Sequence, residues 1–188
     1  YELDIAQELG LSPDVKIKKD GTPQVLIYHT HTGESFLKTE MPNFYSSLDT
    51  RSRDENLNVI AVGNEITKKL EEAGIGVIHD TTIHDDPYTG ETIQRNLNEN
   101  PTIQVTIDVH RDALGGESTR IKPTTVINGR KAAQIMILSG YDGDGSLGFP
   151  DWELNLRLAL RLQQNCANIE QSFIRPLNFT NSRYNMNA

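Results

Sequence analysis

The chain has 188 residues, a hydrophobic fraction of 36% and a net charge of −8 at neutral pH. This length and composition are typical of one ordered globular domain, and the acidic balance argues against a nucleic-acid partner, whose phosphates would repel it. No apolar run approaches the ~18 residues of a membrane span. The single cysteine, Cys166, excludes an internal disulfide and a cysteine-based zinc site.

The N-terminal part of the sequence predicts a short helix, a linker and then a buried strand. Apolar residues at helical spacing predict the helix over residues 1–10, which Gly10 ends. Residues 12–23 are polar and rich in turn formers, so residues 1–23 together are expected to form an N-terminal helix and linker. Val25–Tyr28 is apolar, short and bounded by turn residues, which predicts a buried central strand.

A long polar loop and an amphipathic helix follow this strand. Residues 32–53 contain Gly, Pro, Asn and Ser with scattered aromatic residues, which favours a functional loop beside the strand end. From Asp54 to Ala73, apolar residues recur on one face, which predicts a helix that Gly74 ends. Ile75–Ile78 then predicts a second strand.

The second half of the sequence continues the alternation of helices and strands. The expected elements are a helix over Gly90–Asn98, a strand over Ile103–Val109, an edge strand over Thr124–Ile127 closed by an Asn128–Gly129 turn, a buried strand over Ala133–Leu138, and a helix over Trp152–Asn165 capped by Asp151. Asp142–Ser146 lacks the spacing of an EF-hand calcium loop and is interpreted as an acidic turn. Alternating elements predict an α/β fold, with a mostly parallel central sheet and helices on both faces.

Two of the predicted strands carry histidines at their C-terminal ends. His29 and His31 follow the first strand, and His110 follows the strand that begins at Ile103. Because the C-terminal ends of strands in an open α/β sheet meet at one edge, we expect these histidines to lie together. Zinc hydrolases use neutral imidazoles and a carboxylate, with one coordination position open for water. The pattern therefore predicts a metal-dependent hydrolase.

The residues alone leave open which carboxylate completes this site. Glu34 follows His31 at the H-x-x-E spacing that zinc carboxypeptidases use. Glu55 is the alternative, at the N-terminus of the next predicted helix, where an acid also commonly complements the helix dipole. His79 and His84 lie at and after the end of another predicted strand, and we interpret them as structural.

The first strand, the loop and the following helix resemble the zinc N-acetylmuramoyl-L-alanine amidases of the amidase-3 family. Ile27–His31 stands where that family has D-P-G-H, and the helix beginning with Glu55 is similar to its E-x-x-L-N-L helix. The D-V-H that ends in His110 matches the third, strand-borne histidine. By this resemblance His31, Glu55 and His110 are the zinc ligands.

Three motifs together resemble the stage II sporulation protein P family of cell-wall hydrolases. They are H-T-H-x-x-E-S, D-V-H-R-D and R-Y-N at residues 183–185, and the likeness covers most of residues 24–188. It implies zinc as cofactor, peptidoglycan as substrate, and a role in septal thinning and engulfment during sporulation. It further implies cleavage of the muramoyl–alanine amide and of peptide cross-links. The implied partners are a SpoIID-like lytic transglycosylase and a SpoIIM-like membrane protein, at the extracytoplasmic face of the cell membrane of a spore-forming bacterium.

Three further residues are expected to support the site. His29 would point to the same side as His31 on a continuing strand, so it is expected to bind the metal or to donate to the substrate carbonyl. Arg111 and Asp112 are expected to place a substrate carboxylate and to orient His110, because a ligating imidazole generally needs an acceptor for its other nitrogen.

The family's general-base glutamate lies in a segment similar to L-I-E-V-G, after the R-Y-N motif. That position is expected beyond Ala188, so no residue is assigned the role, and residues 1–188 are expected to be a single catalytic domain without its C-terminal part. Two other interpretations remain open. One is a zinc carboxypeptidase-like peptidase that uses His31, Glu34 and His110, and the other is a non-catalytic cell-wall-binding scaffold.

Overall fold

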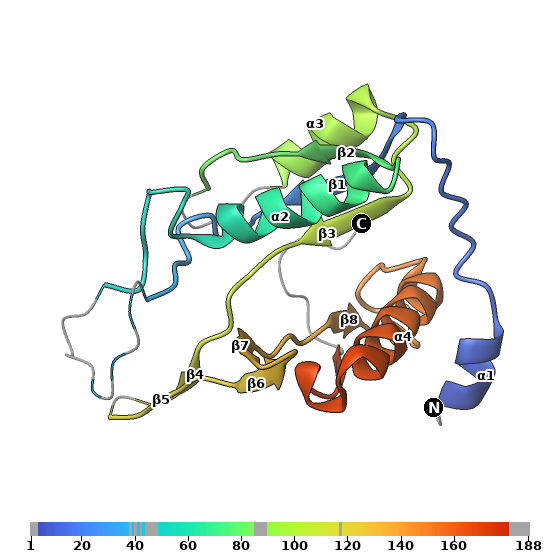
Figure 1. Ribbon diagram of the computed structural model, residues 1–188. Helices are drawn as coiled ribbons and strands as arrows, with labels where there is room; N and C mark the ends of the chain where they lie inside the picture. The colour runs from blue at the N-terminus through green and yellow to red at the C-terminus, as the bar shows by residue number, and fades with distance from the viewer. Residues whose placement is uncertain are drawn as a thin grey trace. The chain divides into compact units, whose positions relative to one another are not determined.

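A computed structural model shows the fold (Figure 1) and describes residues 4–37, 39, 41, 43, 49–84, 90–116 and 118–180. The chain divides into two compact units, one of residues 15–118 and the other of residues 1–14 with 119–188. Each unit is described by itself. That residues 1–188 form a single catalytic domain stays a prediction.

The unit of residues 15–118 is built on a parallel sheet of three strands in the order β2-β1-β3. The central strand is β1 (Pro23–Tyr28), flanked by β2 (Gly76–His79) and β3 (Val105–Asp108). The pairing places Ile27 opposite His79 and Tyr28 opposite Asp108. The C-terminal ends of all three strands therefore meet at one edge, as the sequence predicts.

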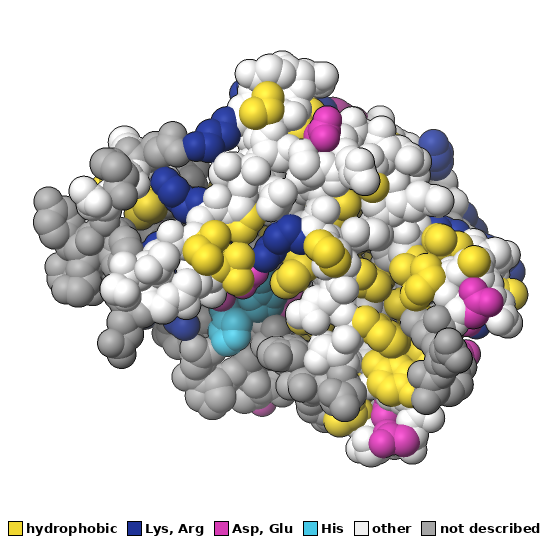
Figure 2. All heavy atoms as spheres, turned by 90° about the horizontal axis from the view of Figure 1, so that it is seen from below, with side chains coloured by type: hydrophobic (Ala, Val, Ile, Leu, Met, Phe, Trp, Pro, Cys, Tyr) yellow, Lys and Arg dark blue, Asp and Glu magenta, His cyan; other side chains and the backbone are white. Residues whose placement is uncertain are grey.

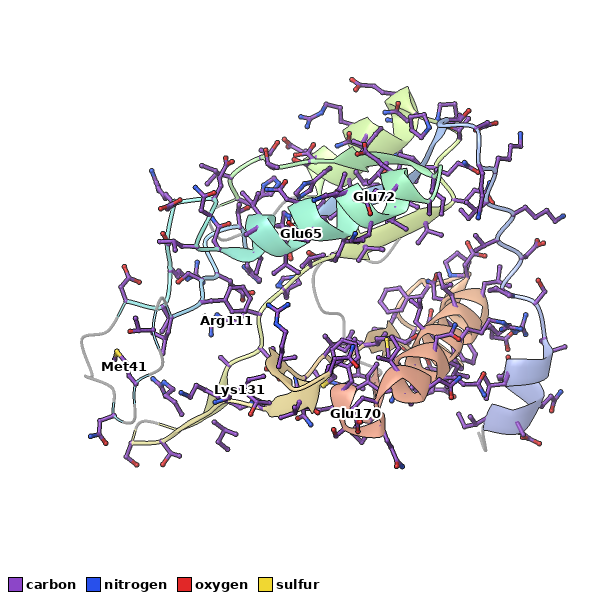
Figure 3. The ribbon with its side chains drawn as sticks, viewed as in Figure 1. Met41, Glu65, Glu72, Arg111, Lys131 and Glu170 are labelled. Atoms are coloured by element: carbon purple, nitrogen blue, oxygen red, sulfur yellow. The ribbon has the colours of Figure 1, made fainter. Side chains whose placement is uncertain are left out.

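Two helices cover the residues that alternate along β1. They are α2 (Val59–Glu72) and α3 (Glu91–Glu99). Val25 and Ile27 pack in one apolar cluster with residues of α2, and Leu26 and Tyr28 pack in another with residues of α3. The wet face of α2 carries charged side chains that include Glu65 and Glu72, both exposed (Figure 3). The buried central strand and the amphipathic helix predicted from the sequence are thus both present.

The start of α2 differs from the prediction. The helix begins at Val59, with the Asn58 side chain accepting the Ile60 N–H at 2.9 Å, and not at Asp54. Asp54 instead accepts the backbone N–H of Asn56 on its own carboxylate at 3.0 Å, which closes a turn. Such a local side-chain bond competes with helix formation, so the helix starts one turn later than the acidic pair indicates.

The other unit packs α4 against short strands. Its elements are α1 (Ile5–Gly10), β6 (Thr124–Ile127), β7 (Arg130–Ala133), β8 (Leu138–Gly140), α4 (Trp152–Ile169), the 3-10 helix η1 (Gln171–Phe173) and β9 (Asn178–Thr180). The short strands β4 (Leu114–Gly115) and β5 (Arg120–Ile121) precede β6. The core contains Phe149, Trp152, Leu156 and Leu160, and an ion pair of 2.7 Å between Glu8 and Arg157 joins α1 to α4.

Predictions for this unit are partly confirmed. The α1 and α4 helices form, and β6 and β7 make an antiparallel hairpin around Asn128 and Gly129, both at positive φ. The buried strand predicted over Ala133–Leu138 is wrong. The stretch is divided between the end of β7 and the start of β8, and Leu138 is 43% exposed.

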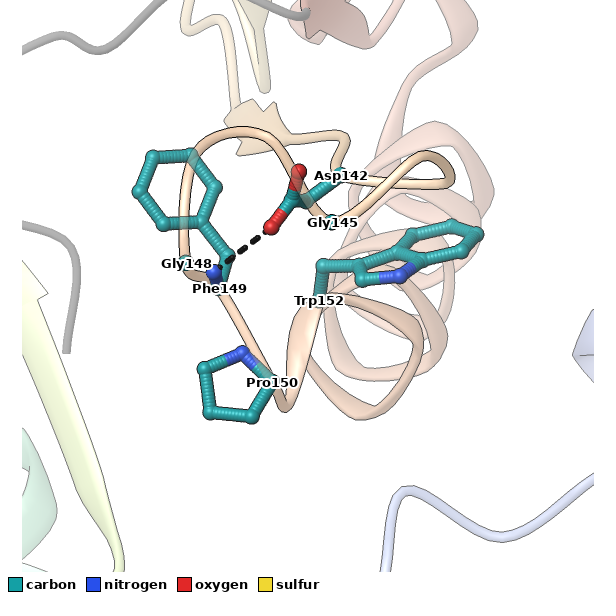
Figure 4. Close-up of a pocket in the computed structure, with 6 residues that line it drawn as sticks. All are labelled: Asp142, Gly145, Gly148, Phe149, Pro150 and Trp152. Carbon is teal, nitrogen blue, oxygen red and sulfur yellow. Dashed lines mark hydrogen bonds between the residues drawn. The ribbon is translucent and has the colours of Figure 1, made fainter.

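The acidic turn at Asp142 closes a loop of the backbone. Its carboxylate accepts the N–H of Leu147 at 2.9 Å and of Phe149 at 2.8 Å (Figure 4), and these bonds hold the pKa of Asp142 below its usual value. Pro150 and Trp152 help to line an open hollow of about 360 Å³ beside it. Because the carboxylate oxygens are engaged by backbone amides, the interpretation as a structural turn is confirmed.

The predicted fold class is confirmed as a mixed α/β architecture with a small parallel sheet. In the part of the chain that the structure describes, no helix combines the length and the apolar character needed to cross a membrane.

Candidate functional site

The histidines at the strand ends form two pairs. His29 and His79 have ring centroids 5.1 Å apart, and His31 and His110 have ring centroids 5.3 Å apart. We name His29 with His79 the inner pair, and His31 with His110 the outer pair. Because β1 ends at Tyr28, strand alternation does not continue to His31, and the two histidines of the H-T-H motif join different pairs.

The inner pair is held by hydrogen bonds to uncharged groups. His29 is 1% exposed, and its Nδ1 lies 3.0 Å from the carbonyl oxygen of Val109. Its Nε2 lies 2.8 Å from Nε2 of His79, whose Nδ1 lies 3.1 Å from the side-chain amide oxygen, Oδ1, of Asn64. Burial lowers the pKa of His29, and burial together with the neighbouring His29 lowers the pKa of His79 to about 4. Both imidazoles are therefore neutral at pH 7.

The outer pair is flanked by carboxylates. Nε2 of His110 lies 2.8 Å from Oδ2 of Asp108, and Nδ1 lies 3.3 Å from Oε2 of Glu34. The Thr30 hydroxyl donates to Asp108 at 2.8 Å and also lies 2.8 Å from His110 Nε2. Burial opposes a charge on His110, but the two carboxylates outweigh it and raise the pKa of His110 to about 9. This environment favours a positive charge.

Glu34 is fixed by the residue that follows His110. Its Oε2 accepts the backbone N–H of Arg111 at 2.7 Å. Burial raises the pKa of Glu34, yet the hydrogen bonds from His110 and from the Arg111 amide outweigh burial, so the pKa lies below its usual value. The Arg111 side chain leaves the chain just after β3 (Figure 3), and its guanidinium donates to the Thr50 carbonyl at 3.4 Å. Glu34 is thus an ionised carboxylate beside the outer pair.

The sequence profile of the family described as Stage II sporulation protein P (SpoIIP) matches residues 5–188. The chain belongs to the SpoIIP family. Comparison with curated proteins and with solved structures gave no match. Membership of the SpoIIP family implies a sporulation-related, peptidoglycan-associated role in a spore-forming bacterium, and it associates the chain with hydrolase-type activity on the cell wall.

Glu55 was predicted as a zinc ligand from the family resemblance. It lies in an exposed turn that precedes α2. Across the described ranges, no group of three or more His, Cys, Asp or Glu side chains is arranged to hold a metal ion. That Glu55 binds zinc stays a prediction. The R-Y-N motif lies outside the described residues.

The outer pair nevertheless brings together donors of the kind that zinc accepts, which are two imidazoles and a carboxylate. His110 Nδ1 and Glu34 Oε2 lie 3.3 Å apart. Figure 2 shows one face of the molecule, on which histidine side chains reach the surface with acidic side chains beside them.

Asp108 and Thr30 are site residues that the sequence interpretation missed. The orienting role was expected for Asp112, but Asp112 is exposed and accepts the N–H of Ala113, whereas Asp108 contacts His110. The available signal was only proximity in the sequence, because Asp108 precedes His110 by two residues but β3 ends at Asp108, so strand alternation does not extend to His110. The interpretation of His84 as structural agrees with its backbone N–H, which donates to the Thr32 hydroxyl at 3.0 Å.

Proposed function

We propose that the chain is a zinc-dependent peptidoglycan hydrolase that cleaves the N-acetylmuramoyl-L-alanine amide, and also peptide cross-links, during septal thinning and engulfment. It acts at the extracytoplasmic face of the membrane, with a SpoIID-like transglycosylase and a SpoIIM-like membrane protein as partners. Membership of the SpoIIP family supports the substrate class. The observation that carries the chemistry is the outer pair, an adjacent couple of imidazoles with carboxylates at both nitrogens of His110.

The residues around His110 determine which of its nitrogens is available. Asp108 accepts a hydrogen bond from Nε2–H, and the Thr30 hydroxyl, itself bound to Asp108, lies within 2.8 Å of the same nitrogen. This arrangement fixes the tautomer and the ring orientation, as carboxylates behind metal-binding histidines do. Nδ1, on the side where Glu34 lies, would then be the nitrogen available to a metal ion.

A zinc ion held by His31, His110 and a carboxylate would lower the pKa of a bound water and polarise the scissile carbonyl. The chain's own residues bind and orient the substrate. The Arg111 guanidinium donates one long hydrogen bond from each amino group, to the carbonyls of Asp112 and Thr50 at 3.4 Å, and as a cation beside the site it suits a carboxylate of the stem peptide. Because His29 is buried in the inner pair, it supports the site from within and does not contact the substrate.

The carboxylate ligand favoured by geometry is Glu34. Its oxygen lies beside His110 Nδ1, whereas Glu55 is exposed in a turn. Glu34 is also the ligand of the carboxypeptidase-like alternative, so the ligand set alone does not separate amide cleavage from removal of a terminal residue. Family membership favours peptidoglycan as substrate in either case.

Zinc affinity of matched variants tests the ligand set. We expect Glu34→Gln to weaken zinc binding, measured by chelator competition, by more than the 10–100-fold that is usual for residues behind the ligands. Glu55→Gln should bind zinc within about twofold of the unmodified chain, since removing an exposed acid changes little. The reverse order of effects would restore Glu55 as the ligand.

Digestion of purified peptidoglycan with added zinc tests the reaction. New muramoyl carboxyl and L-alanine amino termini are expected from amide cleavage. Release of a single C-terminal amino acid would favour the carboxypeptidase-like alternative. Sedimentation with the wall without any product would favour a scaffold and contradict the proposed hydrolase.

A further inference from the structure

The hydrogen bonds of the inner pair form a chain whose direction can be deduced. The Val109 carbonyl can only accept, so Nδ1 of His29 carries the hydrogen across their 3.0 Å contact. Neutral His29 then has its lone pair at Nε2, and Nε2–H of His79 donates to it across 2.8 Å. Nδ1 of His79 is then left as an acceptor. The structure places Oδ1 of Asn64 3.1 Å from it, so this direction requires the Asn64 amide group to be turned over, with its nitrogen facing His79.

This series of hydrogen bonds ends at the carbonyl of Val109, the residue that immediately precedes His110. β3 ends at Asp108, so Val109 is already outside the strand. Its N–H donates to the Tyr28 carbonyl at 3.0 Å, and its carbonyl receives His29. Val109 is 9% exposed, so losing His29 would leave its carbonyl without this donor in a buried position, which is unfavourable. Both polar groups of Val109 are therefore fixed where the chain leaves the sheet.

Helix α2 is adapted to this pair. A Cβ atom placed on Gly63 would overlap Nε2 of His79 and would lie 2.9 Å from Nε2 of His29. Glycine inside a helix is destabilising relative to alanine. At position 63 that cost has a structural reason, since only a residue without a side chain lets α2 lie directly against the two imidazoles.

We propose that His79 is a positioning residue for the candidate zinc site. Through His29 it holds the Val109 carbonyl, and so it fixes the backbone from which His110 projects toward the outer pair. An apolar pair of similar size would fill the same space without buried nitrogens that need partners. The hydrogen-bond chain adds a fixed direction at Val109. The consequence for zinc rests on the proposed function, whereas the contacts that carry the inference do not.

Two substitutions at one position separate positioning from packing. His79→Phe keeps an aromatic ring but cannot donate to His29, and we expect it to weaken zinc binding by on the order of 10-fold, the lower end of the range for residues behind metal ligands. His79→Gln offers an amide N–H to His29 and should recover most of that loss. His84→Phe is the matched control, because it makes the same side-chain change at a histidine that belongs to neither pair, and it should bind zinc as the unmodified chain does.

Nitrogen NMR of the histidine rings, recorded without metal, gives a readout independent of zinc. We expect His29 as the Nδ1–H tautomer and His79 as the Nε2–H tautomer. The ring and amide signals of His110 should move in His79→Phe and stay in His84→Phe. If the unmodified chain binds no zinc, the proposed function fails, while these spectra still decide the inference.

Three results would overturn it. One is a folded His79→Phe variant with unchanged His110 signals and unchanged zinc affinity. Another is a His79→Gln variant that is as impaired as His79→Phe. The third is an Nε2–H tautomer of His29 in the unmodified chain, which needs no variant and so holds even if His79→Phe does not fold.

Discussion

The inner and outer pairs contain the same residue type at the same sheet edge, yet their surroundings differ in charge. The inner pair contacts a carbonyl, a side-chain amide and a glycine, and the pKa of His79 falls to about 4. The outer pair has Asp108 and Glu34 at the two nitrogens of His110, whose pKa rises to about 9. The comparison shows that neighbouring carboxylates, and not the histidines themselves, distinguish a place for a cation from a place without one.

The environment that favours a proton on an imidazole here also favours a metal ion. Both are cations that bind imidazole nitrogen, so a position that stabilises imidazolium through ionised carboxylates also suits a divalent metal. The inner pair lacks such acids on its nitrogens and is neutral. Zinc is therefore expected at the outer pair, and the inner pair is expected to act through its hydrogen bonds.

Replacing a carboxylate beside the outer pair by an amide should have the largest effect among the changes that contrast the two pairs. The same replacement beside the inner pair should change zinc affinity little. Asp108→Asn removes the charge behind His110 Nε2, so we expect a 10–100-fold loss of zinc affinity in chelator competition. Asp80→Asn is the matched change next to His79, where the carboxylate binds Asn96 at 2.7 Å and Arg95 at 3.0 Å. It should leave zinc affinity within about twofold, since Asp80 bonds to helix α3. Equal losses in both variants would contradict the assignment of zinc to the outer pair.

Adding one methyl group against the inner pair should destabilise the fold. Gly63→Ala introduces a Cβ that overlaps His79, and overpacking typically costs about 1–3 kcal/mol. Alanine gains about 1 kcal/mol as a helix former, so a net loss of up to about 2 kcal/mol in the free energy of urea unfolding is expected.

Gly10→Ala is the control for this change. It also lies in a helix, but its Cβ would meet nothing within 4 Å. It should be neutral or stabilising by up to about 1 kcal/mol. A stabilising Gly63→Ala would mean that the pair yields to the methyl group, which contradicts the close fit between α2 and the histidines.

Local sequence patterns were enough to predict the elements that place the site. The run Val25–Tyr28 is buried in the central strand, and the Asn128–Gly129 turn forms its hairpin, because short apolar runs and φ-positive residues act locally. The start of α2 was missed because Asp54 forms a turn of its own. The strand predicted over Ala133–Leu138 was wrong because the two ends of this stretch belong to β7 and β8, which pair with different strands, and no local pattern reveals that.

The division of the histidines into two pairs could not be read from their spacing. It depends on where β1 stops pairing, at Tyr28, and on Gly63 from a helix more than thirty residues away along the chain. Asp108 contacts His110 two residues further along, but β3 ends at Asp108, so strand alternation alone does not predict this contact. Tertiary contacts thus decide which imidazoles meet, while the residues that flank each one lie near it in sequence.

The pH dependence of stability should show the smallest effect and distinguishes the pairs without metal. Between pH 6.5 and 4 the unfolded chain binds a proton at His79 that the folded chain does not, because the folded pKa is about 4. The free energy of unfolding should therefore fall as the pH falls through this window. His79 is only half-buried, so after allowance for solvent screening the loss is about 1–2 kcal/mol.

Comparing two pH profiles isolates this contribution. Burial also lowers the pKa of His29 and His84, so the unmodified chain keeps a slope from those groups even when His79 is replaced. For each protein, the free energy of urea unfolding at pH 4.5 is subtracted from its value at pH 7, with chelator present. The result for His79→Phe is then subtracted from the result for the unmodified chain. A positive remainder of about 1 kcal/mol is expected, since only the unmodified chain must keep this imidazole neutral. Parallel profiles would show that His79 accepts a proton in the folded state, which would remove the contrast between the inner and outer pairs.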